Sequence, residues 1–140
     1  MSESVGMAPQ SALAIAVAAP FGGIYDYLAG PAVGAVRGTI VIVPFGGRYL
    51  PGIVMGAAIG DVPVAKLRAV ESLVTLPPLS DAFVQFIERV AAWTMAPLGA
   101  VVKMVLSQPA AFNCPPQQKR YSIGTPTSET RLTPARQHVL

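Results

Sequence analysis

A regular alternation of small and large side chains marks the first patterned stretch of the chain, ALAIAVAA at residues 12–19. Leu13, Ile15 and Val17 recur at every second position, so they share one face of a predicted β-strand. The other face is almost entirely alanine, which predicts that a second element packs closely against it as well. Pro20 ends the strand.

The next apolar run predicts a β-hairpin. Residues 39–45 are rich in β-branched and aromatic side chains, and residues 49–58 form the returning strand. Between them, Gly46 and Gly47 supply the positive φ angles that a tight hairpin turn requires.

Irregular positions then predict a bent sheet. Pro51 and Gly52, inside the returning strand, indicate an edge or a bulge. A sheet bent at such points tends to close into a small barrel. Residues 61–74 predict a short helical turn and then an extended piece, which ends at Pro77 and Pro78.

The clearest helical pattern follows, with Ser80 as a plausible N-cap and Asp81 in a position that favours the helix dipole. Its predicted buried stripe, at spacings of three, four and seven residues, consists of Phe83, Phe86, Ile87, Val90 and Thr94, with Trp93 at the margin. We expect this stripe to belong to the core, not to a platform for stacking bases. Pro97 ends the helix and can occupy the first position of a second one.

These elements predict an α+β fold, in which a small bent antiparallel β-sheet or partly closed barrel is followed by two helices. The expected organisation is a flexible N-terminus (1–9), a folded domain (10–107), a polar, proline-rich linker (108–131) and the start of another helix (132–140). A helix that begins near the end of the sequence predicts that the chain is a piece of a longer protein.

Composition narrows the class of protein. Only 12% of residues are charged, against a typical share of about 25%, which predicts that a partner or another domain covers part of the surface. The net charge of +3 permits contact with nucleic acid without proving it. The uncharged run 4–25 is interrupted by Pro9 and Pro20 and is preceded by Glu3, which argues against a signal peptide or membrane span and for a cytoplasmic protein.

Little in the sequence predicts catalysis. Cys114 is the single cysteine, which excludes an internal disulfide and a cysteine-based zinc site. The single histidine, His138, lies in a separate predicted helix, and no P-loop motif for ATP is present. We therefore expect no catalytic activity, metal or cofactor in this chain. An enzyme fragment completed by other domains stays open as an alternative, and it would require Cys114 or His138.

A lone acid between two aromatic residues is the most unusual local feature: Asp26 is flanked by Tyr25 and Tyr27. Spacing alone favours a strand edge at which the carboxylate binds backbone amides. The alternative is a binding site, because aromatic rings stack on any base and a carboxylate can accept a hydrogen bond from a hydroxyl.

Four segments in order resemble the N-terminal domain of the primosomal replication-restart DNA helicases, the PriA family: YDYL, VPFGGR, GIV and APLGAVV. The resemblance covers roughly residues 10 to 110, and LTPARQHVL at the end of the chain resembles the opening helix of the family's winged-helix domain. In this family the N-terminal domain binds the 3′ end of the nascent leading strand at a stalled fork without reading its sequence. ATP, magnesium and zinc belong to other parts of the parent protein.

The resemblance implies a set of site residues, which are Tyr25, Asp26, Tyr27, Gly46 and Arg68. The family has phenylalanine where Tyr25 stands and lysine where Arg68 stands. Arg48 is a further candidate for phosphate contact. We expect Asp26 to accept a hydrogen bond from the terminal 3′ hydroxyl or from a base edge and to repel a phosphate. The expected partners are DNA 3′ ends and forked DNA. The alternative is a protein-interaction module that docks other primosome proteins or single-strand-binding protein, with the aromatic residues as anchors.

Overall fold

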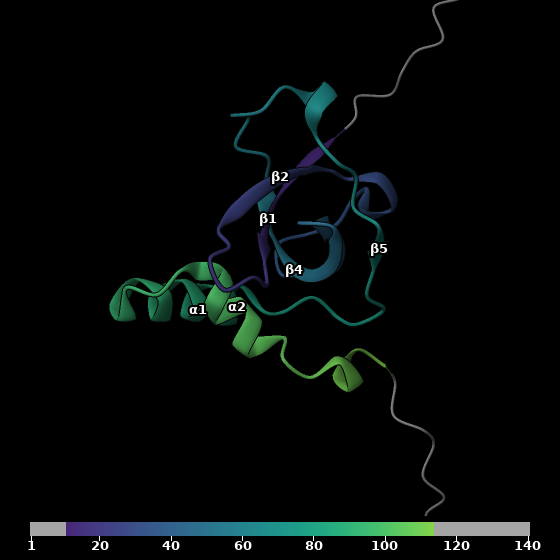
Figure 1. The fold of residues 1–140 in the computed structure, drawn as a ribbon. Helices are drawn as coiled ribbons and strands as arrows, with labels where there is room; N and C mark the ends of the chain where they lie inside the picture. The colour runs from purple at the N-terminus through teal and green to yellow at the C-terminus, as the bar shows by residue number, and fades with distance from the viewer. Residues whose placement is uncertain (1–10, 114–140) are drawn as a thin grey trace, which may run out of the picture.

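The structure, a computed structural model, describes residues 11–113 and has the predicted α+β architecture (Figure 1). Five strands come first, and two helices follow them. The strands are β1 (Ala12–Val17), β2 (Ile24–Leu28), β3 (Ile40–Phe45), β4 (Arg48–Ala57) and β5 (Ser72–Leu73), and the helices are α1 (Asp81–Thr94) and α2 (Leu98–Val105). Three short 3-10 helices lie at Gly30–Ala32, Val64–Lys66 and Pro109–Phe112.

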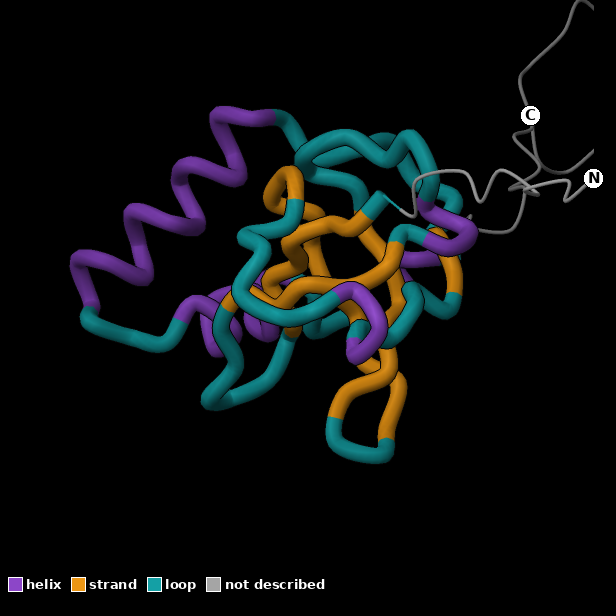
Figure 2. The backbone as a smooth tube through the Cα atoms, turned by 90° about the horizontal axis from the view of Figure 1, so that it is seen from above, coloured by secondary structure: helices purple, strands orange, loops and turns teal. Residues whose placement is uncertain are grey.

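The strands form one antiparallel sheet in the order β2-β1-β4-β3-β5. The sheet curls strongly without closing into a continuous ladder (Figure 2). One isolated parallel bridge, Leu28 with Ala69, links the β2 edge to the segment before β5. There the amide of Leu28 donates to the carbonyl of Arg68 at 2.8 Å, and the amide of Val70 donates to the carbonyl of Leu28 at 2.9 Å. The bent sheet is confirmed, and the barrel remains open.

The β3–β4 hairpin forms as predicted. Gly46 and Gly47 have φ angles of 57° and 77°, and Phe45 pairs with Arg48 across the turn. Both glycines therefore adopt the left-handed backbone conformation that a two-residue turn of this kind requires.

The edge or bulge predicted at Pro51 and Gly52 does not lie there. β4 is a central strand between β1 and β3, and the irregular register lies at Ala14/Ile15 opposite Val54 and Gly56. Gly52 is instead required by packing, because a Cβ atom there would come within 2.6 Å of the Ile15 side chain.

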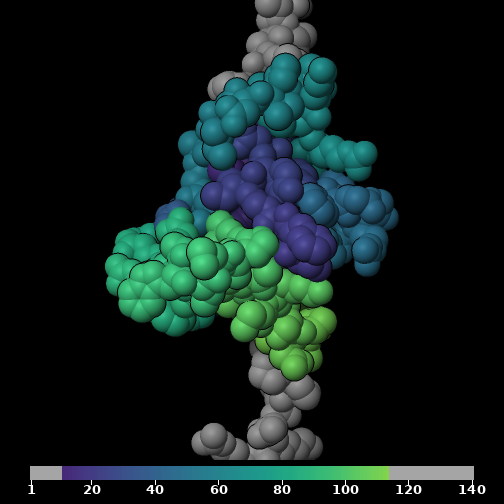
Figure 3. Space-filling view, turned by 60° about the vertical axis from the view of Figure 1, so that its left-hand side comes forward, coloured from purple at the N-terminus to yellow at the C-terminus, as the bar shows by residue number. Residues whose placement is uncertain are grey.

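Both faces of β1 are buried, in two separate clusters of core residues. Ile15 and Val17 point into the curl of the sheet together with Val41 and Val54. On the other face, the alanines meet the two helices, in a cluster that includes Ala16, Ala18, Val84, Ile87, Val101 and Val102. The predicted close packing on the alanine face is confirmed, and the two helices are seen against the strands in Figure 3.

Helix α1 begins and ends close to the predicted residues. The Ser80 hydroxyl accepts a hydrogen bond from the amide of Phe83 at 3.3 Å, which is an N-cap contact. Met95, with a φ of 53°, ends the helix, and Pro97 is the N-cap of α2, one position before its predicted place.

The predicted buried stripe of α1 is largely wrong. The residues that α1 buries are Val84, Ile87 and Ala91, whereas Phe86 is 58% exposed and Trp93 82% exposed. Helix α1 packs against α2, which lies on β1, and its three buried residues join the same core cluster as Ile53, Met55 and Val102. The rings of Phe83 and Phe86 stack on each other at the surface, with centroids 6.2 Å apart.

Arg37 fastens α1 to the sheet. Its guanidinium contacts Asp81 and Glu88 of α1, each at 2.8 Å, and donates to the carbonyl of Met55 in β4 at 2.8 Å. This arginine is therefore engaged within the fold.

The segment after α2 also contacts the core, because Phe112 packs on the cluster that the two helices form with the alanine face of β1. The rest of the predicted linker, the predicted helix at 132–140, Cys114 and His138 lie outside the described residues, as do residues 1–10. Between residues 11 and 113, no helix is long and apolar enough to cross a bilayer.

The first turn of α2 packs directly on the backbone at the end of β1 and the corner that follows it. The amide of Gly99 donates to the carbonyl of Gly22 at 2.8 Å. A Cβ atom at Gly99 would lie 2.6 Å from each of three carbonyl oxygens, those of Val17, Ala19 and Gly22.

We therefore predict that Gly99→Ala lowers the free energy of unfolding by about 1–3 kcal/mol, although alanine is the better helix former. Urea denaturation measures the change. Gly23→Ala is the matched control, because Gly23 has open space around its Cβ position and should tolerate the methyl group. Equal stability of wild type and Gly99→Ala would show that the contact is not tight.

Candidate nucleic-acid interface

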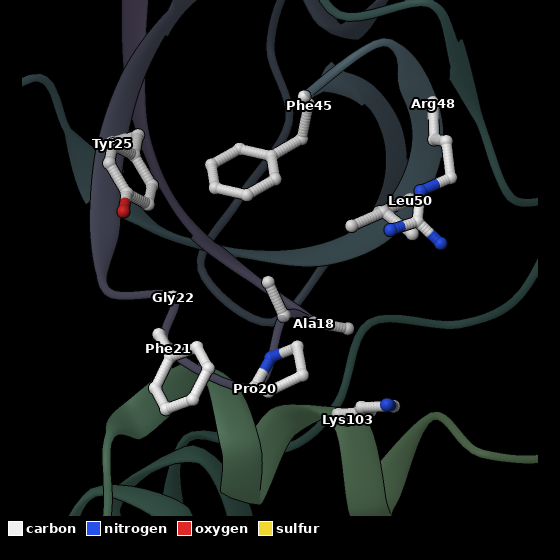
Figure 4. A pocket seen from close by; sticks show the side chains of 11 residues that line it. Ala18, Pro20, Phe21, Gly22, Tyr25, Phe45, Arg48, Leu50 and Lys103 are labelled. Atoms are coloured by element: carbon white, nitrogen blue, oxygen red, sulfur yellow. The ribbon is translucent and has the colours of Figure 1, made fainter.

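A cavity of about 530 Å³ opens between the β3–β4 hairpin, β2, the corner that follows β1, and α2 (Figure 4). It is lined by Ala18, Ala19, Pro20, Phe21, Gly22, Tyr25, Phe45, Gly46, Arg48, Leu50 and Lys103. We call this cavity the aromatic pocket. Its walls come from segments far apart in the sequence, which the curl of the sheet and the packing of α2 bring together.

Three rings give the aromatic pocket its character. Those of Tyr25 and Phe45 are 5.2 Å apart between centroids and inclined at 55°. Phe21 lies on the α2 side of the opening in Figure 4 and is 92% exposed. An aromatic ring so open to solvent is available to stack on a planar ligand.

The charge of the aromatic pocket is positive. Arg48 and Lys103 are the charged residues of its lining, which contains no carboxylate. Within residues 11–113 the ion pairs both belong to Arg37, so these two cations are free to meet an anion. Two cations beside exposed rings match the needs of a nucleotide, which has a π face and a phosphate.

The structure divides the predicted site residues into two groups. Tyr25, Gly46 and Arg48 line the aromatic pocket together. Tyr27 follows Tyr25 on the same face of β2 but is buried, and the side chains of Asp26 and Arg68 are likewise outside the lining.

The Asp26 carboxylate holds the loop after β4. Its two oxygens accept hydrogen bonds from the amides of Ile59 at 2.9 Å and Gly60 at 2.8 Å. This is the backbone-binding role that spacing alone favoured, although the partners are more than 30 residues away and not in the adjacent turn. Each oxygen keeps a second acceptor position.

Tyr27 joins β2 to the end of β3. Its hydroxyl donates to the carbonyl of Pro44 at 2.9 Å. Burial raises the pKa of Tyr27 above its usual value, the neighbouring Tyr25 raises it further, and the positive charge of Arg68 acts in the opposite direction. Arg68 itself is exposed.

Strand β2, which carries Tyr25 inside the aromatic pocket and Asp26 outside it, is an edge strand of the sheet. The bridge to residues 68–70 covers its end at Leu28, while no strand of the described chain pairs with its outer side at Ile24–Asp26. Along this open edge, side chains alternate between the two faces of the strand, with Tyr25 on one and Asp26 on the other.

Among the lining residues that sequence reasoning missed, Phe21, Phe45 and Lys103 carry a ring or a charge. Phe45 is part of the VPFGGR segment, and Phe21 lies a few residues before YDYL, so a motif contained the first and stood close to the second. Lys103 carries no signal in the sequence, because only the packing of α2 brings it to the aromatic pocket.

We predict that Tyr27→Phe lowers the free energy of unfolding by about 1–2 kcal/mol at pH 8, because the Pro44 carbonyl loses its donor. The folded state favours the neutral phenol, so this contribution is full below pH 10 and is lost as the pH rises through the raised pKa. The stability difference between the two proteins should therefore narrow above pH 10. Denaturation at pH 8, 9, 10 and 11 measures it, and a constant difference would contradict the account.

Comparison with protein families bears directly on this site. The PriA 3′ DNA-binding domain model matches residues 14–107, about two thirds of the chain. No curated protein matches the chain. The matched domain binds DNA, and no catalytic domain is identified. The resemblance drawn from YDYL, VPFGGR, GIV and APLGAVV is confirmed: the chain belongs to the 3′ DNA-binding domain family of the replication-restart helicase PriA.

Proposed function

We propose that the chain captures the 3′ end of the nascent leading strand at a stalled replication fork, without reading its base sequence. It would do so in the cytoplasm, as a module of a 3′–5′ DNA helicase whose ATP, magnesium and zinc sites lie in other domains. The observation that carries the proposal is the aromatic pocket, which combines exposed rings with two cations and lacks acids. Its position within the matched domain supports the same reading.

The terminal base would stack in the aromatic pocket, on Tyr25 and Phe45 from one side and on Phe21 from the other. Stacking of this kind gives about 1–3 kcal/mol per base and tolerates every base, which suits a reader of ends. Gly46 would admit the sugar, because its φ is 57° and no atom lies within 4 Å of a Cβ position there.

The terminal hydroxyl would reach Asp26 over the rim of β2. The amides of Ile59 and Gly60 fix the carboxylate in one orientation and leave an acceptor position on each oxygen. A 3′ phosphate at this place would be repelled by the carboxylate, which would make the site selective for a free hydroxyl. Arg68 and Arg48 would offset the charge of the preceding phosphates, and Tyr27 would hold β2 in position.

Fluorescence anisotropy at low salt tests the proposal, with three short single strands that end in a 3′ hydroxyl, a 3′ phosphate or a bulky 3′ block. We expect wild type to prefer the free hydroxyl. Tyr25→Ala should weaken binding roughly 5- to 150-fold, the equivalent of one lost stack. Tyr49→Ala is the control, because Tyr49 is an exposed tyrosine of the same hairpin outside the aromatic pocket. Equal binding of all three strands would overturn end recognition.

Asp26→Ala in the same assay separates two roles of the carboxylate. If Asp26 accepts the terminal hydroxyl, the variant loses the preference for 3′ hydroxyl over 3′ phosphate. If Asp26 only holds the loop after β4, the variant is less stable but retains the preference. The free energy of unfolding of the variant, measured by denaturation, reports on the contact between Asp26 and the loop after β4 independently of DNA binding.

A second candidate function, docking of other primosome proteins or single-strand-binding protein, is favoured by the surface of α1. Phe83, Phe86 and Trp93 are exposed there, although their spacing predicted burial. Neighbouring apolar rings at the surface are typical of interaction sites. This face belongs to a different element from the aromatic pocket, so both functions can coexist.

We predict that Trp93→Ala weakens binding to single-strand-binding protein at least tenfold, because large aromatic side chains dominate such contacts. Binding to the 3′-hydroxyl strand should be unchanged. Calorimetric titration measures the first and anisotropy the second. Met104→Ala, at an exposed apolar position on α2, is the matched control. Unchanged protein binding by Trp93→Ala would exclude this face as the docking surface.

A further inference from the structure

A second cavity adjoins the aromatic pocket. It measures about 410 Å³ and shares three lining residues with the aromatic pocket, namely Ala18, Leu50 and Lys103. The two cavities therefore meet along these residues, and Lys103 stands at their junction. We call the second one the apolar pocket.

The chemistry of the apolar pocket differs from that of its neighbour. Beyond the shared residues its wall includes Ile42, Pro51 and Phe112, and Lys103 is the charged residue of its lining. Phe112 is anchored on the helix-side core, so this wall is built from packed elements. An apolar cavity with one cation in its wall fits a flat apolar group that carries a negative charge on one side.

The position of Lys103 follows from the packing of α2. Gly99 and Lys103 are four residues apart and share one face of the helix. Gly99 is held against the carbonyl of Gly22, and Phe21 and Gly22 line the aromatic pocket. The same contact that fixes the helix therefore directs Lys103 toward the cavities, and Figure 4 shows it on the α2 side, across from Arg48.

We propose that the apolar pocket receives the base of the penultimate nucleotide and that Lys103 contacts the phosphate joining it to the terminal nucleotide. The inference rests on the proposed function, because the penultimate base reaches the apolar pocket only when the terminal base occupies the aromatic pocket. The ligand of the complete site is then the last two nucleotides of a DNA strand. Phe112 and Pro51 supply apolar contact to the second base, and no base-specific hydrogen bond is needed.

The test uses the full 140-residue chain and a short oligothymidine with a free 3′ hydroxyl. Binding of this strand is compared with binding of the same strand in which the last phosphodiester linkage is replaced by a neutral methylphosphonate. Wild type should bind the neutral linkage several-fold more weakly, whereas Lys103→Gln should bind both strands equally and lose about one unit of salt slope. Lys66→Gln is the matched control, because Lys66 is exposed and lies outside both cavities. It should behave as wild type.

A third strand, with an abasic penultimate nucleotide, probes the apolar pocket itself. Wild type should lose affinity for it, and Phe112→Ala should bind it as well as the intact strand. The inference would be overturned if Lys103→Gln discriminated between the intact and the neutral linkage as strongly as wild type does. It would also be overturned if wild type bound the abasic strand as tightly as the intact strand. If Tyr25→Ala also leaves binding unchanged, the proposed function fails. If Tyr25→Ala weakens binding but neither Lys103→Gln nor the abasic strand changes the affinities, the proposed function stands and only the two-nucleotide site fails.

Discussion

The contact between Gly99 of α2 and the corner after β1 is the constraint on which the rest of the site depends. Three backbone carbonyls occupy the space that any side chain at Gly99 would need. The helix therefore rests directly on backbone, at a distance that larger residues would prevent. This contact closes the helix layer over the alanine face of β1, sets the corner that carries Phe21, and turns Lys103 toward the hairpin. The aromatic pocket lies beside this contact, where the helix layer meets the corner after β1 and the β3–β4 hairpin.

Much of the fold could be predicted from local chemistry. The Gly46-Gly47 turn and the Ser80 cap each satisfy a backbone requirement within a few residues, so the sequence signals were sufficient. The buried face of α1 was assigned wrongly, because Val84, Ile87 and Ala91 form an apolar stripe that overlaps the aromatic one at Ile87. Periodicity does not say which of two stripes faces the core. Only the assembled fold, in which α1 packs against α2 and completes the cluster with β3 and β4, makes the choice.

The site was predictable where it coincides with a motif. Tyr25, Gly46 and Arg48 come from YDYL and VPFGGR, and they line one cavity. The amide partners of Asp26 lie more than 30 residues away, beyond the reach of any local argument. Lys103 enters through helix packing alone. Residues that line a cavity from a neighbouring layer leave no periodic trace in the sequence, and they emerge only when the layers are assembled.

The central claim is that the DNA 3′ end occupies the aromatic pocket between the hairpin and α2. Backbone amide chemical shifts during titration with a short 3′-hydroxyl strand test it most directly, because they report on every part of the domain at once. The account predicts that the largest changes fall at Phe21, Gly22, Tyr25, Phe45 and Gly46. Changes confined to the outer face of α1, around Phe86 and Trp93, would contradict it.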